Sequence, residues 1–325
     1  MTPSKKPLRV AIVGGGPAGM EAARIATVRG HHAVLFEKSG ELGGAILGCC
    51  MVPGKEKMRW YLDWLRDEMR ELGVDVRLNH APAVDELKPF DIILNATGAS
   101  SYVPEVFGRS DKVLGFEEVM ACPRANCECY PGDRHNVKVG RRVLLWGDHY
   151  AAADTAAFLA SIGKEVTIVT ENREFAAQVE VIHMYVLRKR FAQTDAEALS
   201  SKPYKYPVTV ITNSTVVEVR EGEVVLQDKD FQRTTVPIDD IVTCHTRPNA
   251  AFLHELQAAG LPVISVGDAI RPRSLYAAVK EGAAFGLNLD EEMLFNANHV
   301  MVTALPVDVL GQLRRPEVIP MQVNR

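Results

Sequence analysis

Apolar and polar positions near the start of the chain form a regular series of blocks. An apolar run over residues 8–13 stops at three consecutive glycines, 14–16. A pattern with helical spacing follows over 20–29, and a second apolar run over 33–36 ends at Glu37. Continuous apolar runs of this length are typical of strands buried on both faces of a parallel sheet. The pattern therefore predicts a strand–turn–helix–strand unit of an α/β fold.

The same approach predicts further elements beyond this unit. Residues 57–72 have the spacing of an amphipathic helix, and strands are predicted over 74–78 and 90–98. The tract 100–139 contains several prolines and glycines, which indicates connecting structure with at most one short helix near 116–120. A domain boundary is expected in this tract.

A second unit of the same kind begins at Arg142. It has a predicted strand over 143–148, a helix over 151–163 and a strand over 165–171. This internal repeat implies two domains of the nucleotide-binding type. The remaining predicted elements are β-hairpins over 207–236, a strand over 240–244, a helix over 250–259, a strand over 263–266 and a helix over 275–289.

Composition narrows the class of protein. The chain has 325 residues, is 47% hydrophobic and carries a formal net charge of −4. Such a chain is an ordinary globular protein, with neither the basic surface that nucleic acid requires nor an apolar run near the ~18 residues of a membrane span. The amino terminus leads directly into a predicted strand and shows no signal peptide, so we expect a cytoplasmic protein whose cysteines are thiols.

The glycines of the first turn have the spacing of a dinucleotide-binding site. Gly14 permits a tight turn, Gly16 lets the backbone approach a pyrophosphate, and Gly19 lets the helix pack closely on the strand. Phosphates are attracted by the free N–H groups and the dipole of the helix N-terminus. Glu37 can accept hydrogen bonds from ribose hydroxyls. The predicted first site consists of Gly14, Gly16, Pro17, Ala18, Gly19, Glu37 and Lys38.

Several motifs together resemble one group of enzymes. They are GGGPAG, Glu37, Gly43-Gly44, ATG at 96–98, and VGDA at 266–269 with the helix that follows. The set resembles flavoproteins with two dinucleotide-binding domains. It is more closely similar to the carboxy-terminal half of trimethylamine dehydrogenase and 2,4-dienoyl-CoA reductase, fused members of the old yellow enzyme group. The segments GELGGAILGCCMVPGKEKMRWYLDWL and GDAIRPRSLYAAVKEG carry much of this resemblance.

The resemblance implies a fold and a domain arrangement. The fold class would be α/β, with two Rossmann-like dinucleotide-binding domains of the glutathione-reductase type, the second nested within the first. The expected division has a discontinuous FAD- or ADP-binding domain over 1–121 and 262–325, a cysteine-containing linker over 122–138, and an inserted NAD(P)-binding-like domain over 139–261.

The resemblance also implies roles for individual residues. Gly43 and Gly44 would lie near the middle of the cofactor, and Asp268 would bond to the ribityl chain of FAD. In trimethylamine dehydrogenase the equivalent site holds only ADP, so the expected cofactor is FAD or ADP in its place. The other residues expected in this site are Thr97, Gly98 and Gly267.

The second glycine turn departs from the nucleotide-binding pattern. Its sequence, GDHYAA at 147–152, keeps one glycine, and Asp148 would place a carboxylate beside an incoming phosphate. The segment CHTRPN resembles the AxGxRPN segment of the same enzymes, but it has Thr246 where close backbone approach favours glycine. We therefore expect the second domain to be degenerate as an NAD(P)H site.

Cysteines offer two other candidate sites. Cys122, Cys127 and Cys129 lie in the linker, but their spacing matches no standard zinc or iron–sulfur motif, so free thiols are favoured over a metal site. Cys49 and Cys50 follow the second glycine pair and could approach a flavin. Adjacent cysteines lack the spacer of a CxxC redox pair, so packing is their expected role.

The sequence contains no counterpart of the substrate side of the enzymes that it resembles. Those enzymes begin with a flavin-bearing TIM barrel, typically ~250 residues, and a cysteine cluster for a [4Fe–4S] centre. We expect FMN and [4Fe–4S] in a separate barrel subunit of the old yellow enzyme group, with an electron-transfer protein as a further partner. The apolar tail 291–325 and the aromatic residues Trp60, Tyr61 and Trp64 are candidates for a subunit contact or for internal packing.

Three functions are consistent with these features. The first is an FAD- or ADP-binding subunit of a heteromeric trimethylamine-dehydrogenase-like oxidoreductase or demethylase. The second is a free-standing FAD-dependent NAD(P)H reductase that passes electrons to a protein partner, which the degenerate second turn disfavours. The third is a non-catalytic structural module whose nucleotide only stabilises the fold. The catalytic residues and the substrate stay open, because the substrate pocket would lie in the barrel.

Overall fold

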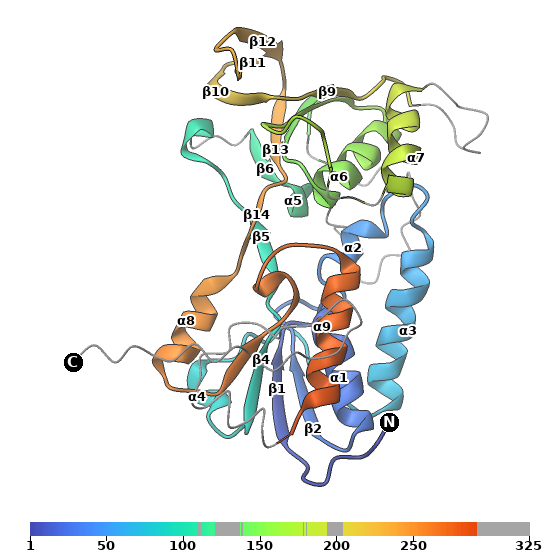
Figure 1. The fold of residues 1–325 in the computed structure, drawn as a ribbon, viewed down its shortest axis with the longest axis vertical. Helices are drawn as coiled ribbons and strands as arrows, with labels where there is room; N and C mark the ends of the chain where they lie inside the picture. Colours follow the sequence, from blue (N-terminus) through green and yellow to red (C-terminus); the bar gives the residue numbers. More distant parts are fainter. Residues whose placement is uncertain are drawn as a thin grey trace. The chain divides into compact units, whose positions relative to one another are not determined.

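The chain folds into two compact units in the computed structural model (Figure 1). Unit 1 is Met1–Ile46, Arg59–Ala99 and Arg247–Arg325, and unit 2 is Leu47–Met58 and Ser100–Thr246. Within the described ranges, every helix is too short or too polar to span a bilayer. The structure describes residues 1–108, 112–120, 137, 139–177, 179, 181–193 and 204–290.

A parallel sheet forms the centre of unit 1, with the strand order β15-β4-β1-β2-β3. Val10 on the central strand pairs with Ala33 on one side and Ile92 on the other. Every residue of the next strand, Ile92–Asn95, is buried, as expected for a strand covered on both faces. The strands are β1 (Arg9–Val13), β2 (His32–Phe36), β3 (Asp75–Arg77), β4 (Ile92–Asn95) and β15 (Val263–Ser265).

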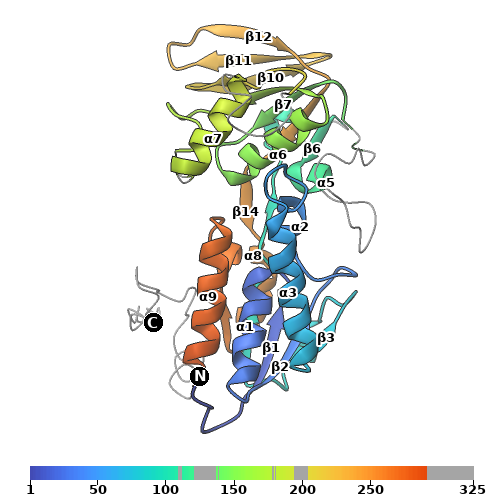
Figure 2. The ribbon, with the colours of Figure 1, turned by 90° about the vertical axis from the view of Figure 1, so that its right-hand side faces the viewer.

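Helices cover both faces of this sheet. Figures 1 and 2 show α9, α1 and α3 side by side over one face. On the other face, Ala11 and Val13 of β1 pack with Leu87 of α4 and Leu256 of α8. The helices of this unit are α1 (Pro17–Val28), α3 (Lys57–Glu71), α4 (Val84–Leu87), α8 (Ala250–Ala258), α9 (Leu275–Asn288) and the 3-10 turn η2 (Gly267–Ala269).

Small residues let α1 and α9 approach closely. A Cβ atom on Gly282 would lie 2.2 Å from the carbonyl oxygen of Ala18, and one on Gly286 would lie 2.6 Å from Cβ of Ile25. Larger side chains at either position would push the helices apart. The contact between Gly282 and Ala18 fixes α9 against the first turn of α1, which follows the first glycine turn.

Unit 2 contains a second parallel sheet, with the strand order β6-β13-β7-β8-β9. One face packs against a helical core that includes Phe158 of α6 and Leu187 of α7. On the other face, Leu144 and Trp146 of β7 pack against Val224 of an antiparallel sheet, β10-β11-β12. These strands are β6 (Val113–Gly115), β7 (Arg142–Trp146), β8 (Glu165–Val169), β9 (Thr209–Ile211), β10 (Ser214–Arg220), β11 (Glu223–Asp228), β12 (Arg233–Pro237) and β13 (Asp240–Thr243).

Shorter elements complete the described chain. β5 and β14 form a two-stranded sheet. The bounds of these strands and of the remaining helices are β5 (Ala99–Ser101), β14 (Thr246–Pro248), α2 (Ile46–Cys49), η1 (Glu105–Phe107), α5 (Phe116–Met120), α6 (Tyr150–Ser161) and α7 (Val181–Ala192).

Most predicted elements are present, with small shifts at their ends. The short helix near 116–120 is confirmed as α5, but the interpretation of 100–139 was incomplete, because β6 joins the parallel sheet. With only Val113–Gly115, this strand is too short to give a periodic signal. Helix α7 was not predicted. The domain boundaries stay predictions, and the linker 122–138, except residue 137, and the tail 291–325 lie outside the described residues.

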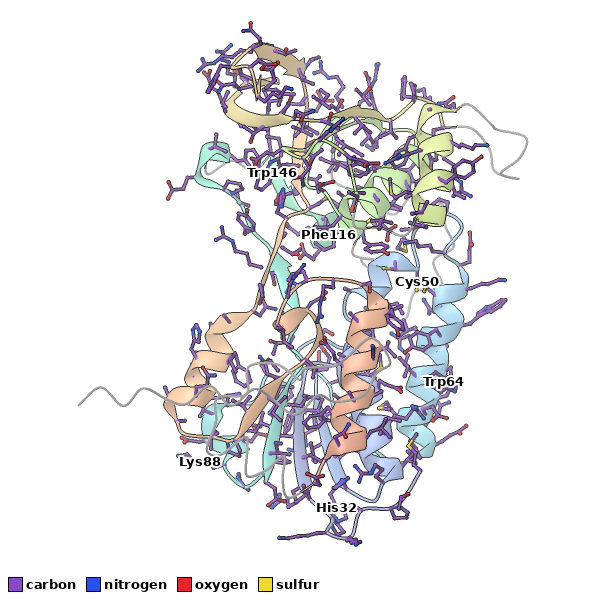
Figure 3. All side chains as sticks on the ribbon, viewed as in Figure 1. His32, Cys50, Trp64, Lys88, Phe116 and Trp146 are labelled. Atoms are coloured by element: carbon purple, nitrogen blue, oxygen red, sulfur yellow. The ribbon has the colours of Figure 1, made fainter. Side chains whose placement is uncertain are left out.

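The aromatic residues of α3 differ in their exposure. Trp60 and Trp64 are 70% and 42% exposed, and Figure 3 labels Trp64 on α3. Tyr61 is partly buried, with its ring centroid 5.8 Å from that of Trp64. Neither tryptophan is a core residue, but the Arg24 guanidinium of α1 lies 5.3 Å from the Trp64 ring centroid, so internal packing holds for Trp64. A subunit contact stays a prediction.

Candidate nucleotide-binding site

The first glycine turn is held against the end of β4. Gly14 has φ +116°, and a Cβ atom there would lie 2.2 Å from the carbonyl oxygen of Ala96. Its N–H donates to the carbonyl oxygen of Phe36 at 2.8 Å, so the turn also contacts β2. A Cβ on Gly19 would lie 2.0 Å from the Gly14 carbonyl oxygen. Glycine is therefore required at both positions for the turn to close onto the sheet and the helix.

Gly16 has a different environment. It is the N-cap of α1, has φ −76°, and provides no side-chain hydrogen bond to the helix. No described heavy atom lies within 4 Å of a Cβ built on Gly16. Pro17 is at the first helical position, where its missing N–H costs nothing. The N-terminus of α1 thus has uncapped donors beside open space, the arrangement that binds a phosphate group.

Glu37 reaches the glycine turn with its carboxylate. The residue is buried, and its Oε2 accepts a hydrogen bond from Gly15 N–H at 2.7 Å, while Oε1 accepts one from Ser39 N–H at 2.8 Å. A carboxylate has about four acceptor positions, so both oxygens keep capacity for ribose hydroxyls. Glu37 therefore also stabilises the turn, a role that the sequence analysis missed. Lys38, beside it, is exposed.

The second glycine pair lies on the first turn. Gly43 N–H donates to the carbonyl oxygen of Gly15 at 2.9 Å. A Cβ on Gly44 would lie 3.1 Å from Cα of Gly16. Both glycines have positive φ, +143° and +53°. The structure thus brings the predicted residues of the two glycine segments together at the start of α1.

Two asparagines fix the end of β4. Oδ1 of Asn95 accepts hydrogen bonds from the Thr97 hydroxyl at 2.7 Å and from Thr97 N–H at 3.3 Å. Asn249 donates from Nδ2 to the Thr97 carbonyl oxygen at 2.8 Å and from its backbone N–H to the carbonyl oxygen of Gly98 at 3.0 Å. These contacts set the path of the predicted residues Thr97 and Gly98 beside Gly14. The sequence analysis assigned no role to either asparagine.

The turn after β15 also reaches the start of α1. Gly267 has φ +63°, and a Cβ on it would lie 3.3 Å from Cβ of Ala18. Asp268, the next residue, is partly buried and accepts a hydrogen bond from Arg273 N–H at 3.0 Å. Burial raises the pKa of Asp268, an effect opposed by Arg273. The predicted residues Ala18 and Gly267 are thus neighbours, and Asp268 is next in the chain.

At the second turn, the N-terminus of α6 is capped by a side chain of the turn itself. His149 is the N-cap of α6, and its Nδ1 accepts a hydrogen bond from Ala151 N–H at 3.2 Å. Only a neutral imidazole can accept this bond, and burial, with the nearby His245, lowers the pKa of His149. A Cβ on Gly147 would lie 2.7 Å from Cβ of Cys244, so the remaining glycine serves packing within unit 2.

The neighbours of His149 are also engaged. The Asp148 carboxylate is buried and accepts hydrogen bonds from the Asn172 amide and from Ala176 N–H. The ring of His245 lies 4.0 Å from that of Trp146, centroid to centroid, at the end of β7, where Figure 3 labels Trp146. We expected Asp148 to repel a phosphate. The structure instead shows its carboxylate held by the segment 172–176, while His149 covers the helix N-terminus.

Cys49 and Cys50 do not have the environment of reactive thiols. Burial raises the pKa of Cys49 to about 12, and its Sγ lies 3.9 Å from Oδ2 of Asp154. Cys50 is buried. These observations support the expected packing role. Among the described residues, no group of three or more His, Cys, Asp or Glu is placed to hold a metal ion, and Cys122, Cys127 and Cys129 lie outside those residues.

Comparison with known proteins finds relatives of this chain among redox enzymes. No family model matches the chain. It is 32% identical over 295 residues to the bilirubin reductase of Mediterraneibacter gnavus, a match that covers 87% of this chain and 41% of that protein. Further relatives are oxidases, dehydrogenases and demethylases. The chain's relatives are oxidoreductases. This agrees with the expected oxidoreductase role, and the chain spans about two fifths of the length of these curated relatives.

Solved structures define the fold. A 2-naphthoyl-CoA reductase has a TM-score of 0.75 with 24% identity, and the match covers 89% of this chain and 41% of that one. The thioredoxin reductase of Lactococcus lactis has a TM-score of 0.60 with 19% identity, and the match covers 89% of this chain and 99% of that one. The predicted α/β class with parallel sheets is confirmed, and the fold is of the thioredoxin-reductase type.

Proposed function

We propose that this chain is the FAD-binding subunit of a heteromeric oxidoreductase or demethylase whose catalytic flavin lies in a separate barrel chain. The observation that carries the proposal is the N-terminus of α1. Its donors are uncapped, the space beside Gly16 is open, and the carboxylate of Glu37 lies on the same turn. Together these features fit the phosphates and the ribose of an adenine dinucleotide.

The residues present fit this group along its length. Backbone N–H groups at the start of α1 would hold the pyrophosphate, and Glu37 would accept hydrogen bonds from the adenosine ribose. Gly43 and Gly44 would leave room near the middle of the cofactor, and Asp268 would accept a bond from the ribityl chain. Bound FAD would supply a ring that accepts and passes on electrons. ADP alone would use the pyrophosphate contacts and Glu37 but would not reach Asp268.

The barrel partner is proposed from the relatives. They are more than twice as long as the part that matches this chain, and their names describe reductases, dehydrogenases and demethylases of small molecules. We infer that a partner subunit of the old yellow enzyme group, with FMN and a [4Fe–4S] centre, supplies the catalytic part that the relatives carry outside the matched region. An electron-transfer protein would be a further partner. Residues 139–261 would form a nested second domain without a working NAD(P)H site.

Two measurements test this proposal. Titration of the purified chain with FAD and with ADP should give saturable binding, and co-expression with a barrel flavoprotein of the old yellow enzyme group should give a complex with turnover. A chain that binds no adenine nucleotide, or full turnover by this chain alone, would contradict the proposal.

A free-standing FAD-dependent NAD(P)H reductase is the second candidate. The match to a thioredoxin reductase over 99% of that protein's length favours it, since such a fold forms a whole protein there. The covered N-terminus of α6 disfavours it. Bleaching of bound flavin by NADH or NADPH, with this chain alone, would select this candidate over the first. A third outcome would select a structural module. In that case, removal of the nucleotide would reduce assembly of the complex but leave the turnover of each assembled complex unchanged.

A further inference from the structure

A buried carboxylate on α9 lies beside the turn that carries Asp268. Glu281 is 6% exposed, and its two oxygens have different partners. Oε2 accepts a hydrogen bond from Gly267 N–H at 2.7 Å, and Oε1 accepts one from the Arg273 guanidinium at 2.5 Å. A buried carboxylate is stable only when it is paired and hydrogen-bonded, and these two contacts meet that need.

Both partners of Glu281 flank Asp268. Gly267 directly precedes it, and the backbone N–H of Arg273 donates to Asp268 Oδ1 at 3.0 Å. The Glu281 carboxylate therefore holds the beginning of the loop 267–273 by a backbone donor and its end by a guanidinium. Displacement of either end would move the carboxylate of Asp268.

The same region is fixed on α1. Gly282, the neighbour of Glu281, would place a Cβ 2.2 Å from the Ala18 carbonyl oxygen, and Gly267 would place one 3.3 Å from the Ala18 side chain. Gly282 in the middle of α9, the loop 267–273 and the first turn of α1 thus meet at Ala18. Within unit 1, this contact sets the separation between the two ends of the proposed cofactor site.

We propose that Glu281 is a positioning residue that holds Asp268 at the distance from the α1 N-terminus that FAD requires. This inference rests on the proposed function. Glu281 does not touch the cofactor; it acts through Gly267 and Arg273. Because ADP lacks the ribityl chain, loss of Glu281 should weaken FAD binding and leave ADP binding nearly unchanged.

A matched control separates this role from simple stabilisation. Glu21 is also 6% exposed, lies in the same unit on α1, and pairs with the Arg24 guanidinium at 2.8 and 2.9 Å. Among the described residues, the hydrogen bonds and the ion pair of Glu21 are to Arg24 and not to the loop 267–273. Glu21→Gln therefore removes a buried charge pair of the same kind at a position outside the site.

The experiment measures FAD and ADP affinity of the full-length wild-type, Glu281→Gln and Glu21→Gln chains by titration. We expect the Kd for FAD to rise about tenfold in Glu281→Gln, equivalent to ~1.4 kcal/mol, while its Kd for ADP stays within about twofold. Glu21→Gln should change both constants by less than about twofold. Equal FAD affinity in Glu281→Gln and wild type, or a parallel loss of FAD and ADP affinity, would overturn the inference.

A second variant covers failure of Glu281→Gln to fold. Arg273 has a side chain that is 34% exposed, and Arg273→Met removes the same ion pair from its outer side. It should give the same selective loss of FAD affinity, and unchanged FAD affinity would overturn the inference. A wild-type chain that binds neither FAD nor ADP would refute the proposed function, an outcome distinct from failure of the Glu281 variants alone.

Discussion

The two glycine turns of the chain share one plan and differ at the helix N-terminus. In both, a parallel strand leads through glycine into a helix, Pro17–Val28 in unit 1 and Tyr150–Ser161 in unit 2. The first helix begins at Gly16, with open space beside it. The second begins at His149, whose ring nitrogen accepts a bond from the helix itself.

This difference shows that the same motif can leave the helix donors open to a ligand or satisfy one of them with a side chain of the chain itself. The first N–H groups of any helix need acceptors from outside the helix. A side chain at the N-cap supplies one and stabilises the helix, whereas glycine leaves the donors for a ligand. The comparison predicts that the first turn binds a nucleotide and that the second does not.

The largest effect is expected from Gly14→Ala, which tests whether the first turn can close. The added Cβ would lie 2.2 Å from the Ala96 carbonyl oxygen in a backbone with φ +116°. We expect the free energy of unfolding, measured in urea, to fall by roughly 3 kcal/mol or more. Gly30→Ala is the control, because Gly30 has φ +89° and no described atom within 4 Å of the new Cβ. It should cost only about 1 kcal/mol. Equal losses would contradict the steric argument.

Gly16→Val should separate binding from folding. The position has ordinary φ and open space, so the free energy of unfolding should change by less than about 1 kcal/mol. The valine side chain would enter the space proposed for the pyrophosphate and raise the Kd for FAD by about a hundredfold, or ~2.8 kcal/mol. Isothermal titration measures this change. Wild-type affinity in a folded Gly16→Val chain would show that the nucleotide does not bind at this turn.

A smaller effect is expected from Glu37→Ala. The variant removes the proposed ribose acceptor and the acceptor of the Gly15 and Ser39 N–H groups. FAD affinity should fall by roughly 1–3 kcal/mol, the range for loss of hydrogen bonds to a charged group. Titration with FAD and with ADP should give similar losses, because both ligands contain the adenosine ribose. Unchanged affinity would remove Glu37 from the site.

The smallest effect concerns pH and the second turn. Burial lowers the pKa of His149 in the folded chain below the ordinary value of 6.5, so the unfolded chain binds protons more readily. Its contribution to stability is then complete above pH 6.5 and is lost as the pH falls below that value. Burial also lowers the pKa values of His31 and His245, which add to the same trend.

Replacement of His149 isolates its share. His149→Asn keeps a good N-cap acceptor that does not titrate, so the variant should lose less stability than wild type between pH 6.5 and pH 5, by about 1 kcal/mol or less. Thermal unfolding at several pH values measures this. An identical pH dependence in the variant and wild type would mean that His149 does not cap α6 in its neutral form.

Sequence patterns could predict the first turn because its determinants are local. The buried strands β1 and β2, the glycines and Glu37 lie within one short segment, and each has a distinct physical role. The cap of α6 could also have been found, since a histidine just before a predicted helix can accept a backbone hydrogen bond.

Other parts of the site depend on contacts between distant segments. Asn95 donates to the Ser265 hydroxyl at 3.0 Å across 170 residues, and Asn249 reaches Thr97 across 152. The sequence analysis gave Glu281 no role, and only the packing of α9 on α1 places it beside Gly267. Such partners have no fixed spacing, so a single sequence gives no signal for them. The same applies to β6, whose three residues gain a strand conformation by pairing with β13.

The central claim is that the chain binds its nucleotide at the first turn and none at the second. Mass spectrometry of the small molecules released when the purified, full-length chain is denatured tests this claim most directly. The account predicts one adenine nucleotide per chain, FAD or ADP, that is lost in Gly16→Val and retained in His149→Asn, with no NAD(H) or NADP(H). Release of a nicotinamide nucleotide, or retention of FAD or ADP by Gly16→Val, would contradict it.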